Sequence, residues 1–136
     1  MQTMIALPRL ARHCLRAQQA RGDIPVAVVL AKKEYEAWFL AAAVSLRGER
    51  QLSLKMTPPP DPESIRDAKG WLRSQLPPNR RYREVTDQPA LTALFDMQQA
   101  RTAASFDKCY REIVRLITAL TQPPGAKAAA MEAPAR

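Results

Sequence analysis

The sequence contains little glycine, cysteine and histidine, and each shortage argues against a class of site. Its 136 residues include four glycines, none of them clustered, which excludes a glycine-rich phosphate-binding loop. The two cysteines, Cys14 and Cys109, lack the spacing of a disulfide framework or a zinc site, so we expect buried free thiols and a cytoplasmic location. His13 is the only histidine. Neither Ser/His/Asp nor Cys/His catalysis therefore has credible members here.

Long apolar runs are also missing, and no stretch is long enough to span a membrane. We therefore expect no membrane partner. What the chain has in excess is positive charge, with 21 Lys and Arg against 13 Asp and Glu and a net charge of +8. Such a balance favours anionic partners, nucleic acid among them. Arg supplies 15 of the 21 basic residues and Ala is abundant, which is also typical of GC-rich bacterial genomes and of ordinary basic proteins.

One apolar run predicts a strand that leads into a helix. Residues 26–31 are apolar on both faces, as in a parallel sheet covered by helices, and residues 34–46 have the spacing of an amphipathic helix. Only residues 51–56 offer a second strand, and a weak one. One or two strands leave backbone hydrogen bonds unpaired at the edges. We therefore predict an α/β fold that is mostly helical, with one clear strand from a larger sheet.

Four further segments have helical spacing, which makes about five predicted helices in all. These segments lie between residues 7 and 22, between 61 and 76, from Asp87 to about Gln98, and over 105–120. Asp61 and Asp87 are suited to cap the helices that follow them. We expect residues 1–121 to form a single domain. Residues 122–136 lack the apolar content to fold, and we expect a disordered tail.

Glu34 and Glu36 are the candidate metal ligands. They follow the predicted strand at the position where ligands collect in open α/β sheets. Carboxylates there are suited to hold Mg²⁺. The alternative is that acids in a first helical turn complement the helix dipole, for about 0.3–1 kcal/mol each. Two acids are also few for a catalytic Mg²⁺ site.

Two basic groups are candidates for contact with nucleic-acid phosphates. The first is Lys32 with Lys33, and the second is a loop containing Arg80, Arg81 and Arg83. Guanidinium groups bind phosphate oxygens in bidentate fashion, and Tyr82 in the same loop is suited to stack on a base. A solvated basic loop is the alternative.

Several segments resemble a bacterial family of unknown function (domain of unknown function 4276). The most specific is Pro25-Val-Ala-Val-Val-Leu-Ala-Lys-Lys-Glu-Tyr-Glu-Ala-Trp-Phe-Leu-Ala-Ala. Residues 58–72, 87–92 and 105–108 resemble later parts of the family in the same order, so that the resemblance covers about residues 7–120. It implies a Toprim-like domain, the Mg²⁺-binding α/β module of topoisomerases, primases and certain nucleases. Members are suspected of nucleic-acid cleavage, often in genomic company with ATPases of mobile-element or phage-defence systems.

The chain departs from this family where the catalytic acids belong. A Toprim site uses a Glu after its first strand and an Asp-x-Asp cluster after a later one, both upstream of the segment that matches residues 7–10. Here residues 1–6 read Met-Gln-Thr-Met-Ile-Ala. Glu36, with Glu34 beside it, is the acid that the resemblance leaves. The resemblance therefore implies the C-terminal half of a Toprim-like protein that is catalytically incomplete alone. Such a chain is a remnant, a chain with a misplaced start, or a subunit whose sheet a partner completes.

Two other functions stay open at this point. The chain is either a non-catalytic basic module that binds nucleic-acid backbone, or an interaction protein associated with an ATPase. A homo-oligomer is compatible with each of these hypotheses, because a second copy also supplies partners for an unpaired strand.

Overall fold

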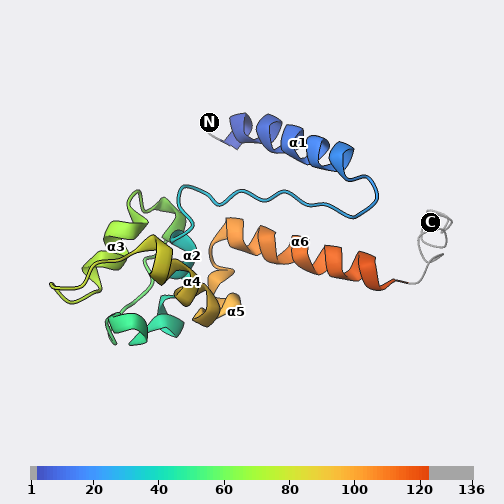
Figure 1. Cartoon of the computed structure of the whole chain (residues 1–136). Coiled ribbons are helices and arrows are strands. Elements are labelled where there is room, and N and C mark those ends of the chain that lie inside the picture. Colours follow the sequence, from blue (N-terminus) through green and yellow to red (C-terminus); the bar gives the residue numbers. More distant parts are fainter. Residues whose placement is uncertain (1–2, 123–136) are drawn as a thin grey trace, which may run out of the picture. The chain divides into compact units, whose positions relative to one another are not determined.

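The computed structural model describes residues 3–122, which are mostly helical (Figure 1). The α-helices are α1 (Thr3–Ala20), α2 (Ala37–Ala41), α3 (Ala68–Ser74), α4 (Glu84–Leu94), α5 (Met97–Ala100) and α6 (Ala104–Thr121). Short 3₁₀ helices cover Ala43–Leu46, Glu49–Gln51 and Pro62–Ser64. No helix in this part of the chain combines the length and the apolar character needed to cross a membrane.

The predicted sheet does not form, and the prediction of a clear strand is wrong for the described residues. Residues 26–31 have no regular secondary structure. Gln51 ends a 3₁₀ helix, and residues 52–56 form a loop with a turn at Leu54 and Lys55, in which the side chains of Leu52 and Met56 are buried. A strand needs a neighbour to accept its backbone hydrogen bonds, and residues 3–122 include no second strand to supply one. The mostly helical character that the sequence predicted is confirmed.

The chain divides into two compact units. The central unit comprises residues 29–110, and the terminal unit comprises residues 1–28 with residues 111–136. A single domain over residues 1–121 was the expectation. The predicted disordered tail lies outside the described residues, apart from Gln122.

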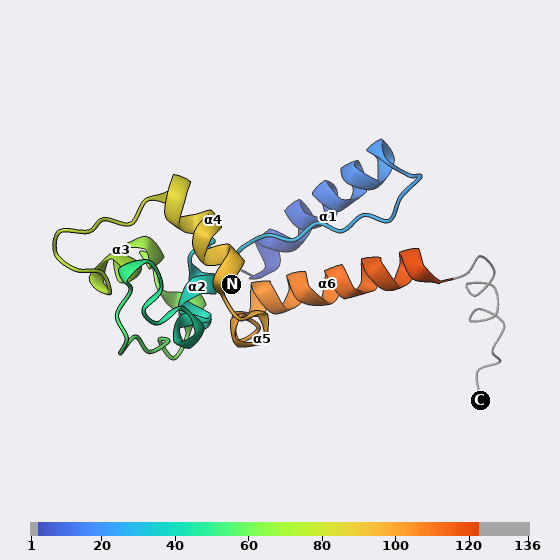
Figure 2. The same cartoon turned by 60° about the horizontal axis from the view of Figure 1, so that its bottom comes forward.

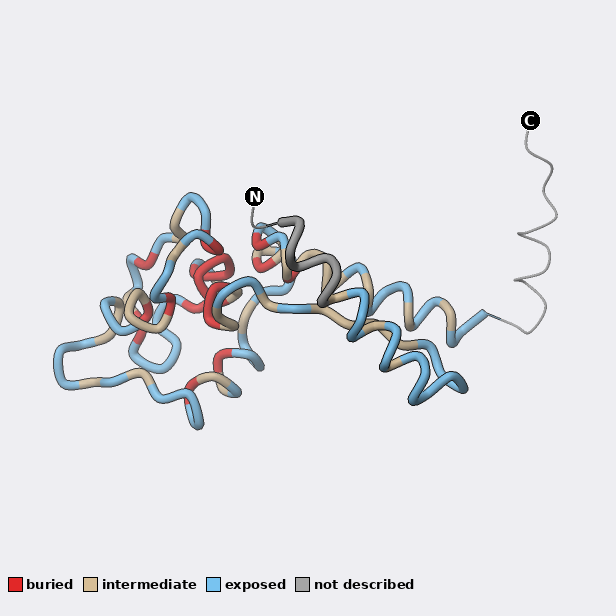
Figure 3. Tube along the Cα trace, turned by 90° about the horizontal axis from the view of Figure 1, so that it is seen from above, coloured by how far each residue is buried: buried red, intermediate tan, exposed pale blue. Residues whose placement is uncertain are grey.

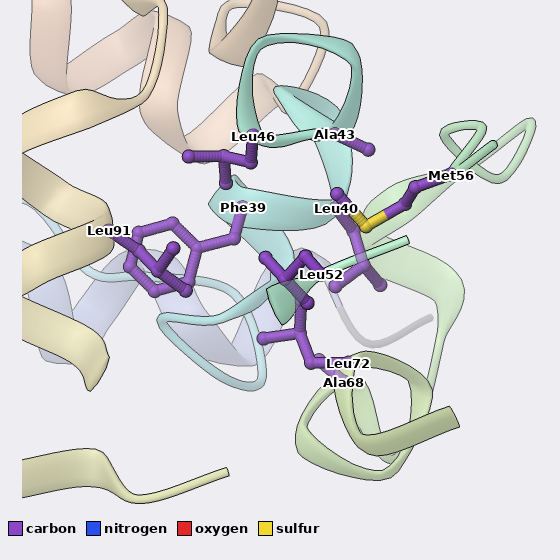
Figure 4. Close-up of a cluster of buried hydrophobic side chains, with 9 residues drawn as sticks. All are labelled: Phe39, Leu40, Ala43, Leu46, Leu52, Met56, Ala68, Leu72 and Leu91. Carbon is purple, nitrogen blue, oxygen red and sulfur yellow. The ribbon is translucent and has the colours of Figure 1, made fainter. Parts of the chain in front are cut away.

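The core lies in the central unit, where α2 to α5 gather in both views (Figure 1; Figure 2). Phe39 and Leu40 of α2 are fully buried at its middle, and Leu72 of α3 and Leu91 of α4 close around them (Figure 4). Ala43, Leu46, Leu52, Met56 and Ala68 complete this cluster. A second cluster joins Ala41, Ala42, Ala100, Ala103 and Phe106. The apolar stripe predicted on residues 34–46 therefore supplies the central residues of the hydrophobic core.

Two predicted helices are shorter than their periodicity suggested. Residues 34–46 divide into α2 and a 3₁₀ helix, because Ala42 departs from α-helical geometry at φ −95° and ψ 21°. Residues 61–76 divide likewise, and Asp67 rather than Asp61 caps α3 by accepting a 2.8 Å hydrogen bond from the Gly70 backbone nitrogen. Apolar spacing does not register such breaks, since both halves still face the core.

The terminal unit buries none of its described side chains, those of residues 10–28 and 111–122. All the buried positions drawn red in Figure 3 belong to the central unit. Cys14 and Cys109 are free thiols, as predicted, but half-buried rather than fully buried. Burial raises the pKa of the Cys109 thiol.

Candidate phosphate-binding site

A basic pocket opens on the central unit, where the loop after α3 meets the start of α4. Its volume is about 530 Å³, and it is lined by Arg50, Asn79, Arg80, Arg81, Arg83 and Thr86. Four of these six residues carry a guanidinium group. No residue that lines the pocket is acidic or aromatic. We call these residues the arginine pocket.

Asp87 of α4 holds two of the four arginines in place. It is 2 % exposed, and its Oδ1 accepts from Arg50 Nε and Arg80 Nη2, both at 2.6 Å. Its Oδ2 accepts from Arg80 Nη1 at 3.0 Å and from the Arg83 backbone nitrogen at 2.7 Å. Burial alone would raise the pKa of Asp87, but the hydrogen bonds from Arg80, Arg50 and Arg83 lower it well below its ordinary range. Asp87 is therefore ionised at neutral pH and fixes both guanidinium groups.

The other two arginines face solvent. Arg81 and Arg83 are exposed, and within residues 3–122 no carboxylate pairs with either guanidinium group. Glu84, next to Arg83 in the chain, pairs with Lys69 instead. The pocket thus combines two guanidinium groups fixed by one buried carboxylate with two exposed guanidinium groups that no carboxylate pairs with in the described part of the chain. Its surplus charge is three positive units.

The sequence analysis found three of these arginines but missed Arg50. Arg50 lies about thirty residues from the loop, in a left-handed backbone conformation with φ 47°. No spacing or motif connects it to Arg80, and only the fold brings it to Asp87. Asp87 was expected to cap a helix; its carboxylate does accept from the backbone of Arg83, but its main partners are the two arginines.

Lys32 and Lys33, the other predicted phosphate contacts, do not line the arginine pocket. Both are exposed, and Lys33 donates from Nζ to the backbone oxygen of Ser64 at 3.2 Å. The fold therefore divides the predicted basic residues into two groups. Arg80, Arg81 and Arg83 meet around one concave surface, and the lysine pair lies outside it.

Tyr82 is turned toward the core and not toward the pocket. Its ring packs against the main apolar cluster, and its hydroxyl donates to Glu36 Oε1 at 3.0 Å. Burial and the negative charge of Glu36 raise the pKa of Tyr82 far above its ordinary value. The predicted stacking of this ring on a base is therefore not available in the observed conformation.

The two glutamates predicted as metal ligands have different hydrogen-bond partners. Glu36 is 1 % exposed, and its Oε1 accepts from Tyr82 and from Gln88 Nε2, the latter at 2.9 Å. Glu34 accepts at Oε2 from the Ala68 backbone nitrogen at 2.6 Å, at the start of α3. Within residues 3–122, no three His, Cys, Asp or Glu side chains come together as a metal site would need. The observed contacts are those of carboxylates that hold α2 to α3 and α4.

Replacing Glu36 by Gln distinguishes a structural role as a hydrogen-bond acceptor from a role as a Mg²⁺ ligand. The amide keeps the shape but exchanges a charged acceptor for a neutral group, so we expect the free energy of unfolding to fall by about 1–2 kcal/mol. We also expect the melting temperature of both proteins to be unaffected by added Mg²⁺. A magnesium site at Glu36 requires the opposite: Mg²⁺ stabilises the parent chain, and the substitution abolishes that stabilisation. Thermal unfolding with Mg²⁺ and with EDTA decides between them.

Glu63 is a third buried carboxylate, and its role was missed. At 4 % exposed, it accepts at Oε1 from the Ser105 backbone nitrogen at 2.7 Å, in the first turn of α6. Glu63 therefore satisfies a backbone N–H at the start of α6, 42 residues further along the chain.

Comparison with known proteins adds no relative: no family model, no curated protein and no solved structure matches the chain. The resemblance to the bacterial family of unknown function stays a prediction, and so does the partial Toprim-like assignment.

Proposed function

We propose that this chain is a basic module that binds the phosphate backbone of nucleic acid in the arginine pocket and catalyses no reaction by itself. The observation that carries the proposal is the convergence of Arg50, Arg80, Arg81 and Arg83 on one concave surface of about 530 Å³. Four guanidinium groups on one hollow mutually repel, and an anion relieves that repulsion. Phosphate oxygens, like those of a carboxylate, match the planar fork of a guanidinium group in bidentate geometry.

Asp87 supports this function because it orients two arginines before any ligand arrives. Arg50 and Arg80 donate to Asp87 through some of their N–H groups and keep others for a ligand. Side chains that are already ordered lose less conformational entropy on binding. A pocket built in this way is more than a solvated basic loop.

The pocket favours recognition of charge over recognition of bases. No aromatic side chain lines it, and the Tyr82 hydroxyl is occupied by Glu36. Stacking on aromatic rings is a large part of single-strand binding in proteins that select single strands. We therefore expect duplex and single-stranded DNA of equal phosphate number to bind with affinities within a few-fold of each other.

Salt dependence tests the proposal directly. A protein that neutralises Z phosphates on duplex DNA shows a slope of about −0.9Z in a plot of log affinity against log salt. With three or four arginines engaged, raising the salt from about 50 to 200 mM should weaken binding about 40- to 150-fold. Fluorescence anisotropy of a labelled duplex measures this. An affinity that changes less than about threefold over that range would contradict contact with the phosphate backbone.

A further inference from the structure

The segment between α1 and α2 is an apolar stretch of chain whose backbone has no partners. Figure 1 draws it as a long tube without helix or arrow. Within residues 3–122 no hydrogen bond joins the backbone of residues 26–31 to any other residue. Its side chains are half-buried at most, and Leu30 is 50 % exposed. This combination is unfavourable in either environment. Water satisfies the backbone N–H and C=O groups but leaves the apolar side chains exposed, whereas burial in a core covers the side chains but leaves the backbone groups unpaired.

The composition of the segment is that of a strand with two different faces. Val26, Val28 and Leu30 alternate with Ala27, Val29 and Ala31, so an extended chain presents larger side chains on one face and smaller ones on the other. β-Branched residues of this kind favour strands. The described part of the chain has no second strand that could pair with this segment.

The charges at the two ends of the segment are opposite. Asp23, whose carboxylate pairs with Arg21 on the exposed surface of the same copy, precedes it, and Lys32 and Lys33 follow it. An antiparallel pair of identical segments therefore puts opposite charges next to each other at both ends, and a parallel pair puts like charges together. In the antiparallel register centred on Val28, Asp23 of one copy lies opposite Lys33 of the other, and Val26 lies opposite Leu30. The segment is complementary to itself.

We propose that two copies of this chain associate through residues 26–31, which form a two-stranded antiparallel ribbon about a twofold axis at Val28. The ribbon supplies the missing partner of the strand that the sequence predicts. A two-stranded ribbon is marginal alone and needs apolar cover. The terminal unit carries exposed apolar side chains for this purpose, since Ile113, Val114, Ile117 and Leu120 of α6 are each at least 48 % exposed.

The terminal unit also has open space beside the start of the segment. A hollow of about 710 Å³ is lined there by Ile24, Pro25 and Val26, together with residues of α1 and α6. Its charged lining residues are already paired, Arg21 with Asp23 and Arg115 with Glu112. An apolar chain can therefore enter this space without leaving an unpaired charge behind.

Disulfide trapping tests both the association and its register. In a chain whose native cysteines are replaced by alanine, Val28→Cys places two thiols directly opposite each other across the twofold axis, within reach of a disulfide. Ala27→Cys is the matched control, because in this register residue 27 lies opposite residue 29. We expect the covalent dimer to form at least about tenfold faster at position 28 than at position 27 under mild oxidation.

Sedimentation equilibrium of the unmodified chain gives an independent measurement. We expect a dimer that strengthens with salt, because each copy carries a net charge of +8 and salt screens the repulsion. Val28→Lys should yield a monomer, since it puts two like charges opposite each other. Val85→Lys, at a residue 89 % exposed in the central unit, should leave the dimer intact.

Two outcomes would overturn the proposal. One is a chain that stays monomeric at every concentration and salt, which would assign the segment to a foreign partner. The other is equal trapping at positions 27 and 28, which would mean random collisions instead of a fixed register. The trapping experiment stays informative even where Val28→Lys fails to fold, because cysteine preserves the apolar character of the position.

Discussion

Replacing Arg81 and Arg83 together by alanine is expected to weaken binding of a DNA duplex about ten- to a hundredfold at low salt. Both side chains are exposed and line the arginine pocket, and neither pairs with a carboxylate in the described part of the chain. Their removal takes away two charges that have no structural partner. Stability should therefore change by less than about 0.5 kcal/mol, because such surface substitutions have little effect.

The lysine pair provides the matched control. The double substitution Lys32→Ala and Lys33→Ala also removes two positive charges, but from exposed positions outside the pocket. If the pocket binds the phosphates, this change weakens binding only through the general field, about threefold or less. The salt slope should fall by about 2 for the arginine variant and remain nearly unchanged for the lysine variant.

Equal losses in the two variants would contradict a localised site. They would mean that the net charge of +8 attracts DNA without any particular surface. A larger loss from the lysine variant would transfer the site to the Lys32–Lys33 pair. Anisotropy titrations of both variants at two salt concentrations distinguish these cases.

Replacing Asp87 by Asn is expected to lower the free energy of unfolding by about 2–4 kcal/mol at neutral pH. The carboxylate is 2 % exposed and accepts four hydrogen bonds, three of them from Arg50 and Arg80. An amide keeps the shape but has no charge, and its nitrogen would face guanidinium donors. Arg50 and Arg80 retain some contact with water, which keeps the loss below that of a fully buried pair.

The same substitution should flatten the acid limb of the stability curve. The pKa of Asp87 is lower in the folded chain than in the unfolded chain, so the unfolded state takes up its proton first as the pH falls. The stability that Asp87 contributes is therefore fully present above about pH 5 and is lost progressively as the pH falls below about 4. The difference between parent and variant in urea unfolding should shrink over that range.

Asp107→Asn is the control for the loss of one acidic charge. Asp107 pairs with Arg101, but both side chains are about one-third exposed, and such pairs contribute about 0–1 kcal/mol. If Asp87→Asn costs no more than this control, or if its effect does not depend on pH, then Asp87 does not organise the pocket as described. Urea titrations of the three proteins at neutral and acid pH give the comparison.

The sequence predicted well what depends on local periodicity. The last predicted helix, residues 105–120, corresponds to α6, and the apolar stripe of residues 34–46 supplies Phe39 and Leu46 to the core. Apolar spacing reports which face of a segment is buried, and that information is contained in a few neighbouring residues. The three arginines of the loop were also predicted from local information, because they are close together in the chain.

The prediction from the sequence was wrong for a segment whose structure depends on a pairing partner. Residues 26–31 have every local feature of a strand, but a strand exists only when a second backbone accepts its hydrogen bonds, and the described chain has none to offer. The local pattern indicates that a segment favours an extended conformation. It does not indicate whether the rest of the molecule provides a neighbouring strand to pair with it.

What the sequence determined by itself is the mostly helical character, the apolar faces, the basic charge and the position of the arginine loop. Only the tertiary structure decided that Arg50 joins this loop at Asp87, that Tyr82 turns inward to Glu36, and that Glu63 serves the start of α6. Each of these contacts joins residues more than thirty positions apart. Their formation depends on which buried charges the packing brings within hydrogen-bond distance, and burial is what makes an unpaired charge too costly to leave alone.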